Sequence, residues 1–122
     1  MAERLNGVRV VLVEDHGDTL DLVQQVLRQL GATVTAVATS REALALVATA
    51  DVVVTDYKLP DEDGIWLLEQ VNKQPCPVPV LLVSGFAPEQ VPRLADARFV
   101  RKLLKPIDPW ELGGIIGDVL GR

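Results

Sequence analysis

The chain has 122 residues, 48% of them hydrophobic and 24% charged, and its formal net charge at pH 7 is −5. This length suits one domain with a substantial core, and the acidic balance argues against nucleic-acid binding. The single cysteine, Cys76, cannot form an internal disulfide or a cysteine zinc site, and the apolar runs are too short to span a bilayer, so we expect a cytoplasmic protein with no membrane partner.

Apolar, β-branched runs of strand length recur along the chain and alternate with segments of helical spacing. The strand-like runs are residues 8–13, 33–37, 52–55, 80–83 and 99–104. The segments of helical spacing are residues 18–30, 40–47, 67–71, 87–95 and 108–120. This alternation predicts an α/β fold in which a five-stranded parallel sheet is flanked by five helices.

Helix ends are predicted from residues that satisfy or interrupt the backbone hydrogen bonds of a helix. Asp18 and Ser40 are expected to cap the first and second helices, and Gly31 to end the first. Asp108, which is followed by proline, is expected to begin the last helix. Pro92 falls inside the fourth helical segment, where proline removes a backbone donor, so we expect that helix to be short or distorted.

Polar residues follow four of the five predicted strands. In a parallel sheet built by helical crossovers, the carboxyl ends of all strands lie at one edge, and ligands of open α/β sheets bind there. The polar residues that this rule brings together are Glu14, Asp15, Asp56, Ser84 and Lys105. Each has another interpretation by itself, because an acidic pair can lead into a helix, and an aspartate or serine can belong to an ordinary turn. Their joint occurrence at one edge predicts a functional site.

Three of these side chains are carboxylates, and neighbouring carboxylates stay ionised together only when a positive charge lies among them. The candidate ligands are all oxygen atoms, which favours Mg²⁺ or Mn²⁺, and His16 is expected to lie in the solvated loop. Lys105 adds an ammonium and Ser84 a hydroxyl donor. A metal, an ammonium and a hydroxyl around Asp56 predict a phosphoryl site in which this carboxylate is the nucleophile.

From about Val8 to Leu120, the sequence resembles the receiver domains (CheY-like) of bacterial two-component response regulators. The resemblance implies the strand order 2-1-3-4-5 and a single receiver domain over residues 1–122, with its core at about 8–120. It implies a signalling switch that uses Mg²⁺ to catalyse its own phosphorylation and dephosphorylation. The expected phosphodonor is a histidine kinase or a histidine phosphotransfer protein.

The resemblance also assigns roles to individual residues. The catalytic residues that it implies are Asp56 as the phosphoacceptor, Ser84 and Lys105. The metal ligands that it implies are Glu14, Asp15, Asp56 and the backbone carbonyl of Lys58. It further implies that the Lys105–Pro106 peptide bond is cis.

Lys102 departs from the family pattern. It stands three residues before Lys105, where relatives usually have an aromatic residue or histidine that changes rotamer on activation. Because burial of an unpaired ammonium is costly, we expect Lys102 to stay solvated. The signal is then expected to pass through the segment Ser84–Ala95, together with the face of the fifth strand and fifth helix, to a downstream protein partner.

Two other functions are compatible with the predicted fold. A Mg²⁺-dependent phosphatase that acts through an aspartyl phosphate would need an acid two residues after its nucleophile, where this chain has Lys58. A flavin or nucleotide carrier would need a loop rich in Gly, Ser or Thr after the first strand, where residues 14–18 are mainly acidic. The switch is therefore the favoured interpretation, either as a stand-alone protein or as part of a longer chain such as a hybrid kinase.

Overall fold

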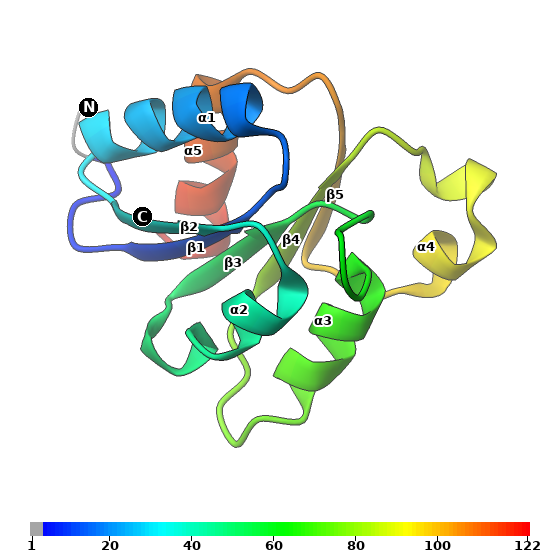
Figure 1. Ribbon diagram of the computed structural model, residues 1–122. Coiled ribbons are helices and arrows are strands. Elements are labelled where there is room, and N and C mark those ends of the chain that lie inside the picture. The colour runs from blue at the N-terminus through cyan, green and yellow to red at the C-terminus, as the bar shows by residue number, and fades with distance from the viewer. Residues whose placement is uncertain (1–3) are drawn as a thin grey trace.

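The computed structural model describes residues 4–122, and a parallel sheet of five strands forms its centre (Figure 1). The strands are β1 (Arg9–Val13), β2 (Thr33–Val37), β3 (Val52–Thr55), β4 (Val80–Ser84) and β5 (Arg101–Leu104). Their spatial order is β2-β1-β3-β4-β5, as predicted. Every residue of β3 and β4 is buried, because these central strands are covered on both faces and their sequences are almost entirely apolar.

Helices cover both faces of the sheet, which confirms the predicted fold class. In the described part of the chain these are α1 (Gly17–Gln29), α2 (Ser40–Leu44), α3 (Gly64–Asn72), α4 (Pro92–Asp96) and α5 (Pro109–Val119), with 3₁₀ turns η1 (Val47–Thr49) and η2 (Pro88–Gln90). Figure 1 shows α1 and α5 on one face and α2 and α3 on the other. The buried side chains accordingly form two cores, one beneath α1 and α5 and the other beneath α2, α3 and α4.

The helix ends match the predictions in part. Gly31 follows α1 with a φ of +99°, and the Asp108 carboxylate accepts the Trp110 amide at the start of α5, both as expected. The residue that precedes α1 is His16 rather than Asp18, and Thr39 rather than Ser40 caps α2. The amide of Ser40 is already bound by another side chain, so this residue lies within the first turn instead of before it.

Pro92 begins α4, whereas the sequence placed it inside a helix. The first position of a helix suits proline because its missing N–H would have no partner there. The predicted segment 87–95 is therefore divided into η2 and a helix of five residues, which confirms that the helix is short. The last strand begins at Arg101, two residues later than predicted, and Phe99 is buried in the core on the α3 side.

The pairing of β1 with β3 sets the geometry of the carboxyl edge. Val13 lies beside Thr55 in the register, and the Asp56 amide donates to the Val13 carbonyl at 3.2 Å. The first residues beyond both strands are therefore neighbours in space. Across residues 4–122, none of the helices has the length and apolar character needed to cross a membrane.

Candidate functional site

The carboxyl edge of the sheet gathers acidic side chains from two strands. Glu14 follows β1 and Asp56 follows β3, and both are buried, with 5% and 8% of their surface exposed. Asp15 lies beside them and is more exposed. Two buried carboxylates at one place require a compensating cation, because burial penalises the charged form and like charges repel.

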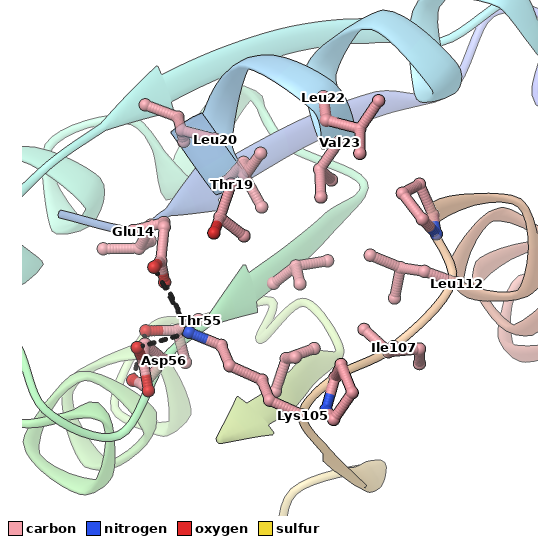
Figure 2. A pocket seen from close by; sticks show the side chains of 16 residues that line it. Glu14, Thr19, Leu20, Leu22, Val23, Thr55, Asp56, Lys105, Ile107 and Leu112 are labelled. Carbon is pink, nitrogen blue, oxygen red and sulfur yellow. Dashed lines mark hydrogen bonds and ion pairs between the residues drawn. The ribbon is translucent and has the colours of Figure 1, made fainter. Parts of the chain in front are cut away.

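Lys105 supplies that cation from the end of β5 (Figure 2). Its Nζ donates to Asp56 Oδ2 at 2.8 Å and to the two carboxylate oxygens of Glu14 at 3.1 and 3.2 Å. Partial burial lowers the pKa of Lys105, but the hydrogen bonds to Asp56 and Glu14 outweigh it and leave the pKa above its usual value. The peptide bond between Lys105 and Pro106 is cis, as predicted.

The loop after Asp56 is held by hydrogen bonds to its own backbone. The Tyr57 amide donates to Asp56 Oδ1 at 2.6 Å, and the Thr55 hydroxyl donates to the Asp56 carbonyl at 2.9 Å. The Gly64 amide closes the loop on the Tyr57 carbonyl at 2.7 Å. A Cβ at position 64 would lie 2.5 Å from the Asp56 carbonyl oxygen, so this close approach requires glycine.

The same loop is fastened to α2 through Asp61. Its Oδ1 accepts the Ser40 amide at 2.9 Å and its Oδ2 accepts the Arg41 amide at 3.0 Å. Desolvation raises the pKa of Asp61, but the amide hydrogen bonds from Ser40 and Arg41 prevail and lower it from 3.8 to about 2. Arg41 also forms an ion pair with Glu62 at 2.9 Å. Sequence reasoning did not identify this anchor, because nothing in the spacing brings residues 40 and 61 together.

Ser84 lies at the carboxyl edge of the sheet, as expected, but its hydroxyl is hydrogen-bonded within the turn that follows β4. Its Oγ accepts the Phe86 amide at 2.9 Å, and its carbonyl accepts the Lys105 amide at 2.7 Å. Among the described residues, the hydroxyl of Ser84 is therefore hydrogen-bonded to the β4–α4 connection and not to a carboxylate of the site. The position was predicted correctly, and contact with Asp56 stays a prediction.

A cleft of about 530 Å³ opens above these groups and contains most of the predicted metal ligands. Its lining residues are Asp15, His16, Asp56, Lys58, Leu59, Pro60, Gly85, Phe86 and Lys105. The Lys58 ammonium lies 5.1 Å from the centroid of the Phe86 ring, so the side chain is turned toward the β4–α4 connection. A carboxylate oxygen of each acid and a nitrogen of His16 lie within 4.8 Å of one another. This donor set can hold a divalent cation.

His16 contacts the acidic pair, and the sequence prediction did not include this residue in the site. Its Nδ1 lies 2.9 Å from Glu14 Oε1 and 3.2 Å from Asp15 Oδ1, although its ring is largely exposed. It lies in the exposed loop before α1 as expected, and these contacts bring it into the acidic cluster, which the sequence prediction did not include. The available signal was its position directly after the acidic pair at the start of a helix, where the chain turns back over the edge of the sheet.

A second, apolar hollow of about 510 Å³ adjoins the site between α1 and the β5–α5 connection (Figure 2). Its apolar lining includes Leu20, Val23, Ile107 and Leu112. Its polar end is formed by Glu14, Thr19, Thr55, Asp56 and Lys105, so the hollow and the cleft share two charged groups, Asp56 and Lys105. Leu22 on α1 also lines it and is 54% exposed.

Comparison with known proteins identifies the family. The family model for the response regulator receiver domain matches residues 10–116. The chain belongs to this family. Receiver domains are the signalling-switch modules of two-component systems. This receiver domain is homologous both to response regulators and to receiver domains found within sensor kinases.

The sequence relatives differ greatly in length. An uncharacterised 14.6 kDa protein of Leptolyngbya boryana is 32% identical to the receiver domain, and the match covers 90% of this chain and 88% of that protein. The Two-component response regulator ARR11 of Arabidopsis thaliana is 34% identical over 95% of this chain and 23% of its own length. The Sensor protein TorS of Escherichia coli is 29% identical over 98% of this chain, which spans only 14% of TorS.

Solved structures confirm the fold. A CheY-like receiver domain protein from Methanospirillum hungatei superposes with a TM-score of 0.83 at 30% identity, covering 93% of this chain and 94% of that one. The receiver domain of the sensor histidine kinase PA1611 from Pseudomonas aeruginosa gives a TM-score of 0.85 at 27% identity, covering 95% and 99%. That structure has a magnesium ion coordinated in its active site cleft.

Proposed function

We propose that this receiver domain accepts a phosphoryl group on Asp56 and thereby works as a switch in a two-component pathway. The observation that carries the proposal is the buried Asp56 carboxylate with the Lys105 ammonium 2.8 Å away. Asp56 directly follows the central strand β3 and is presented by a loop that backbone hydrogen bonds hold in place. A nucleophile fixed beside a cation is suited to attack on a negatively charged phosphorus centre.

The transfer forms one bond and breaks one bond. A carboxylate oxygen of Asp56 attacks phosphorus, and the bond from phosphorus to the donor's imidazole nitrogen breaks, with its electron pair staying on the nitrogen. Lys105 already donates to Asp56, so it is placed to pair with an oxygen of the arriving phosphoryl group. Ser84 would donate to another of these oxygens if its hydroxyl turns from the Phe86 amide.

The acidic cluster supports a magnesium ion as the cofactor, and Mn²⁺ would fit the same oxygen donors. We assign Glu14, Asp15, Asp56 and the backbone carbonyl of Lys58 as the residues that hold it, directly or through water. When bound, the cation would neutralise negative charge on the phosphoryl oxygens. The same cluster, with Lys105 and water, would return Asp56 to the free acid by hydrolysis of the acyl phosphate.

The apolar hollow supports a protein as phosphodonor. It meets the reacting carboxylate at its polar end and exposes Leu22 at its rim. A histidine kinase or a histidine phosphotransfer protein must bring an imidazole to Asp56, and apolar contacts beside the site would hold it there. The phosphatase alternative is less well supported, because Lys58 occupies the place of the required acid and its ammonium lies over Phe86.

Phosphorylation by a small donor tests the proposal directly. Wild type and Asp56→Asn are incubated with acetyl phosphate and Mg²⁺, and the intact proteins are weighed by mass spectrometry. We expect wild type to gain the mass of one phosphoryl group and Asp56→Asn to gain none, and EDTA to prevent the reaction. An equal gain in both proteins would show that Asp56 is not the acceptor.

A further inference from the structure

We infer that His16 is a nitrogen ligand of the metal site and a determinant of its metal specificity. With His16, the site becomes a mixed carboxylate–imidazole site that takes borderline transition metals such as Zn²⁺, Ni²⁺ and Cu²⁺ in addition to Mg²⁺. The inference rests on the metal site proposed above, but it concerns which cations that site selects.

The position of His16 at the end of the β1–α1 connection directs its ring toward the acids. It is the residue before the first turn of α1, and its backbone is extended, with φ of −95° and ψ of 105°. Residues at this position commonly accept a helix amide with their side chain. Here the Nδ1 atom instead faces the carboxylates of Glu14 and Asp15.

The separations between these atoms match those of ligands on one metal. Bonds of about 2.1 Å at right angles place neighbouring ligand atoms about 3 Å apart, which is the spacing of an octahedral site. The His16 Nδ1 atom lies 2.9 Å from Glu14 Oε1 and 3.2 Å from Asp15 Oδ1. One ring nitrogen of His16 and one carboxylate oxygen each of Glu14, Asp15 and Asp56 lie within 4.8 Å of one another. One cation can therefore contact the imidazole and the carboxylates without a large movement.

The chemistry of imidazole determines which cations benefit. Mg²⁺ prefers oxygen ligands and keeps several waters, so an added nitrogen contributes little to its binding. Zn²⁺, Ni²⁺ and Cu²⁺ bind imidazole well and rank above Mn²⁺ in affinity for such sites. Loss of a direct ligand should be at least as harmful as loss of a residue that supports a ligand, which weakens metal binding roughly 10- to 100-fold.

His16 is the only histidine in the chain, so a spectroscopic signature of imidazole identifies it without ambiguity. We would add one equivalent of Cu²⁺ to untagged wild type and record nitrogen couplings by electron paramagnetic resonance. Calorimetric titrations with Zn²⁺, Ni²⁺ and Mg²⁺ would compare wild type, His16→Asn, Asp15→Ala and the control Asp18→Asn. Asp18 is an exposed acid in the first turn of α1 and lies outside the cluster.

We expect imidazole couplings in wild type that disappear in both His16→Asn and Asp15→Ala, because the nitrogen and the carboxylate bind the same ion. His16→Asn should lose at least about tenfold in affinity for Zn²⁺ and Ni²⁺ and change less than about twofold for Mg²⁺. Absence of nitrogen coupling in wild type, persistence of the coupling in Asp15→Ala, or an equal loss of Mg²⁺ affinity in His16→Asn would each overturn the inference.

Failure of the inference can be told apart from failure of the proposed function. Wild type and the control Asp18→Asn, which lies outside the cluster, are therefore assayed both for phosphorylation by acetyl phosphate with Mg²⁺ and for the Cu²⁺ signature. If wild type is not phosphorylated but shows the Cu²⁺ signature and the Zn²⁺ preference, the role of His16 holds while the switch function fails. If phosphorylation proceeds and the signature is missing, the role of His16 fails alone.

Discussion

The Lys105 ammonium lies 2.8 Å from Asp56 Oδ2 and 3.1 Å from Glu14 Oε2, so one side chain from β5 neutralises acids from β3 and β1. This arrangement explains how two buried carboxylates remain together at the edge of the sheet. It also means that Lys105 and a bound divalent cation neutralise the same negative charge. The effects of removing one of them should therefore depend on the presence of the other.

Replacement of Lys105 by methionine should lower the free energy of unfolding by about 1–3 kcal/mol in the absence of divalent cations, because buried acids lose their partner. Addition of Mg²⁺ should raise stability more in Lys105→Met than in wild type. Urea unfolding with and without Mg²⁺ measures both effects. Lys73→Met, at an exposed helix end, is the control. If Mg²⁺ raises the free energy of unfolding of Lys105→Met and of wild type equally, Lys105 and the cation do not neutralise the same charge.

The anchor formed by Asp61 predicts a specific loss of stability in acid. Its pKa is lowered from 3.8 to about 2, since the amide hydrogen bonds of Ser40 and Arg41 outweigh desolvation. A lowered pKa contributes stability that is fully present above about pH 4 and is lost as the pH falls toward about 2. The free energy of unfolding of Asp61→Asn should be about 1 kcal/mol lower than that of wild type at pH 7, as at other capping sites. Between pH 4 and pH 2, the free energy of unfolding of this variant should fall less steeply than that of wild type.

Urea unfolding at several pH values between 2 and 7 measures this prediction. Asp21→Asn is the matched control, because Asp21 is an exposed acid on α1. Between pH 4 and pH 2, the control should lose as much stability as wild type does. If Asp61→Asn also loses as much stability as wild type over this range, the amides of Ser40 and Arg41 do not stabilise the charged form of Asp61 in solution.

The close approach of Gly64 to Asp56 predicts opposite effects for the same substitution at two glycines. In Gly64→Ala, the new methyl group would lie 2.5 Å from a backbone oxygen, so the loop must shift and stability should fall by about 1–3 kcal/mol. At Gly114 within α5, the nearest atom would be at 3.5 Å, which is ordinary contact. The free energy of unfolding of Gly114→Ala should therefore be about 0.5–1 kcal/mol higher than that of wild type, because alanine has a higher helix propensity than glycine. Thermal unfolding of both variants measures the difference.

The second readout of Gly64→Ala is the rate of phosphorylation. A displaced Asp56 carbonyl disturbs the loop that presents the nucleophile, so acetyl phosphate should react more slowly, whereas Gly114→Ala should react like wild type. A stable Gly64→Ala that is phosphorylated at the normal rate would show that the loop accommodates the methyl group elsewhere.

Most of the carboxyl edge could be predicted from the sequence, because helical crossovers fix where every parallel strand ends. Glu14, Asp56 and Lys105 each follow an apolar run directly, and this is enough to place them together. The strand order itself came from family resemblance. The structure confirms it, and with it the adjacency of β1 and β3 that the site requires.

The remaining features depend on side-chain direction and on contacts between distant loops, which spacing does not encode. His16 turns to the acids because it lies at the extended position before α1. Asp61 reaches the amides of α2 across 20 residues of sequence, and this contact moves the predicted cap from Ser40 to Thr39. The hydroxyl of Ser84 is bound within its own turn, although its strand ends where predicted.

The exposed rim of the apolar hollow predicts different responses to two phosphodonors. Leu22→Ser should slow phosphotransfer from a phosphorylated histidine phosphotransfer domain that loads wild type, because an apolar contact beside the site is lost. The reaction with acetyl phosphate should be unchanged, since Leu22 lies outside the charged cluster. Leu104→Ser, at an exposed leucine of β5 that does not line the hollow, is the control. If the protein donor phosphorylates wild type and Leu22→Ser at equal rates, the rim of the apolar hollow does not contact the donor.

The contacts of the segment 84–97 indicate how phosphorylation would change it. The Ser84 hydroxyl holds the Phe86 amide, and the Phe86 ring packs edge-on against Tyr57 with centroids 6.0 Å apart. A phosphoryl group on Asp56 that draws the Ser84 hydroxyl inward would release that amide. The short helix α4 follows, and few backbone hydrogen bonds stabilise it. Phosphorylation, or its beryllofluoride mimic, should therefore change amide exchange most in residues 85–97.

Lys102 decides between two mechanisms for this change. Its Nζ donates to the Ala95 carbonyl at 3.1 Å at the surface, so it is neither buried nor unpaired, and a hydrogen bond of this exposed kind contributes about 1 kcal/mol or less. Lys102→Ala should therefore keep the exchange change in residues 85–97, whereas Ser84→Ala should reduce it. If Lys102→Ala abolishes or relocates the change while Ser84→Ala preserves it, the lysine transmits the signal and the release of the Phe86 amide does not.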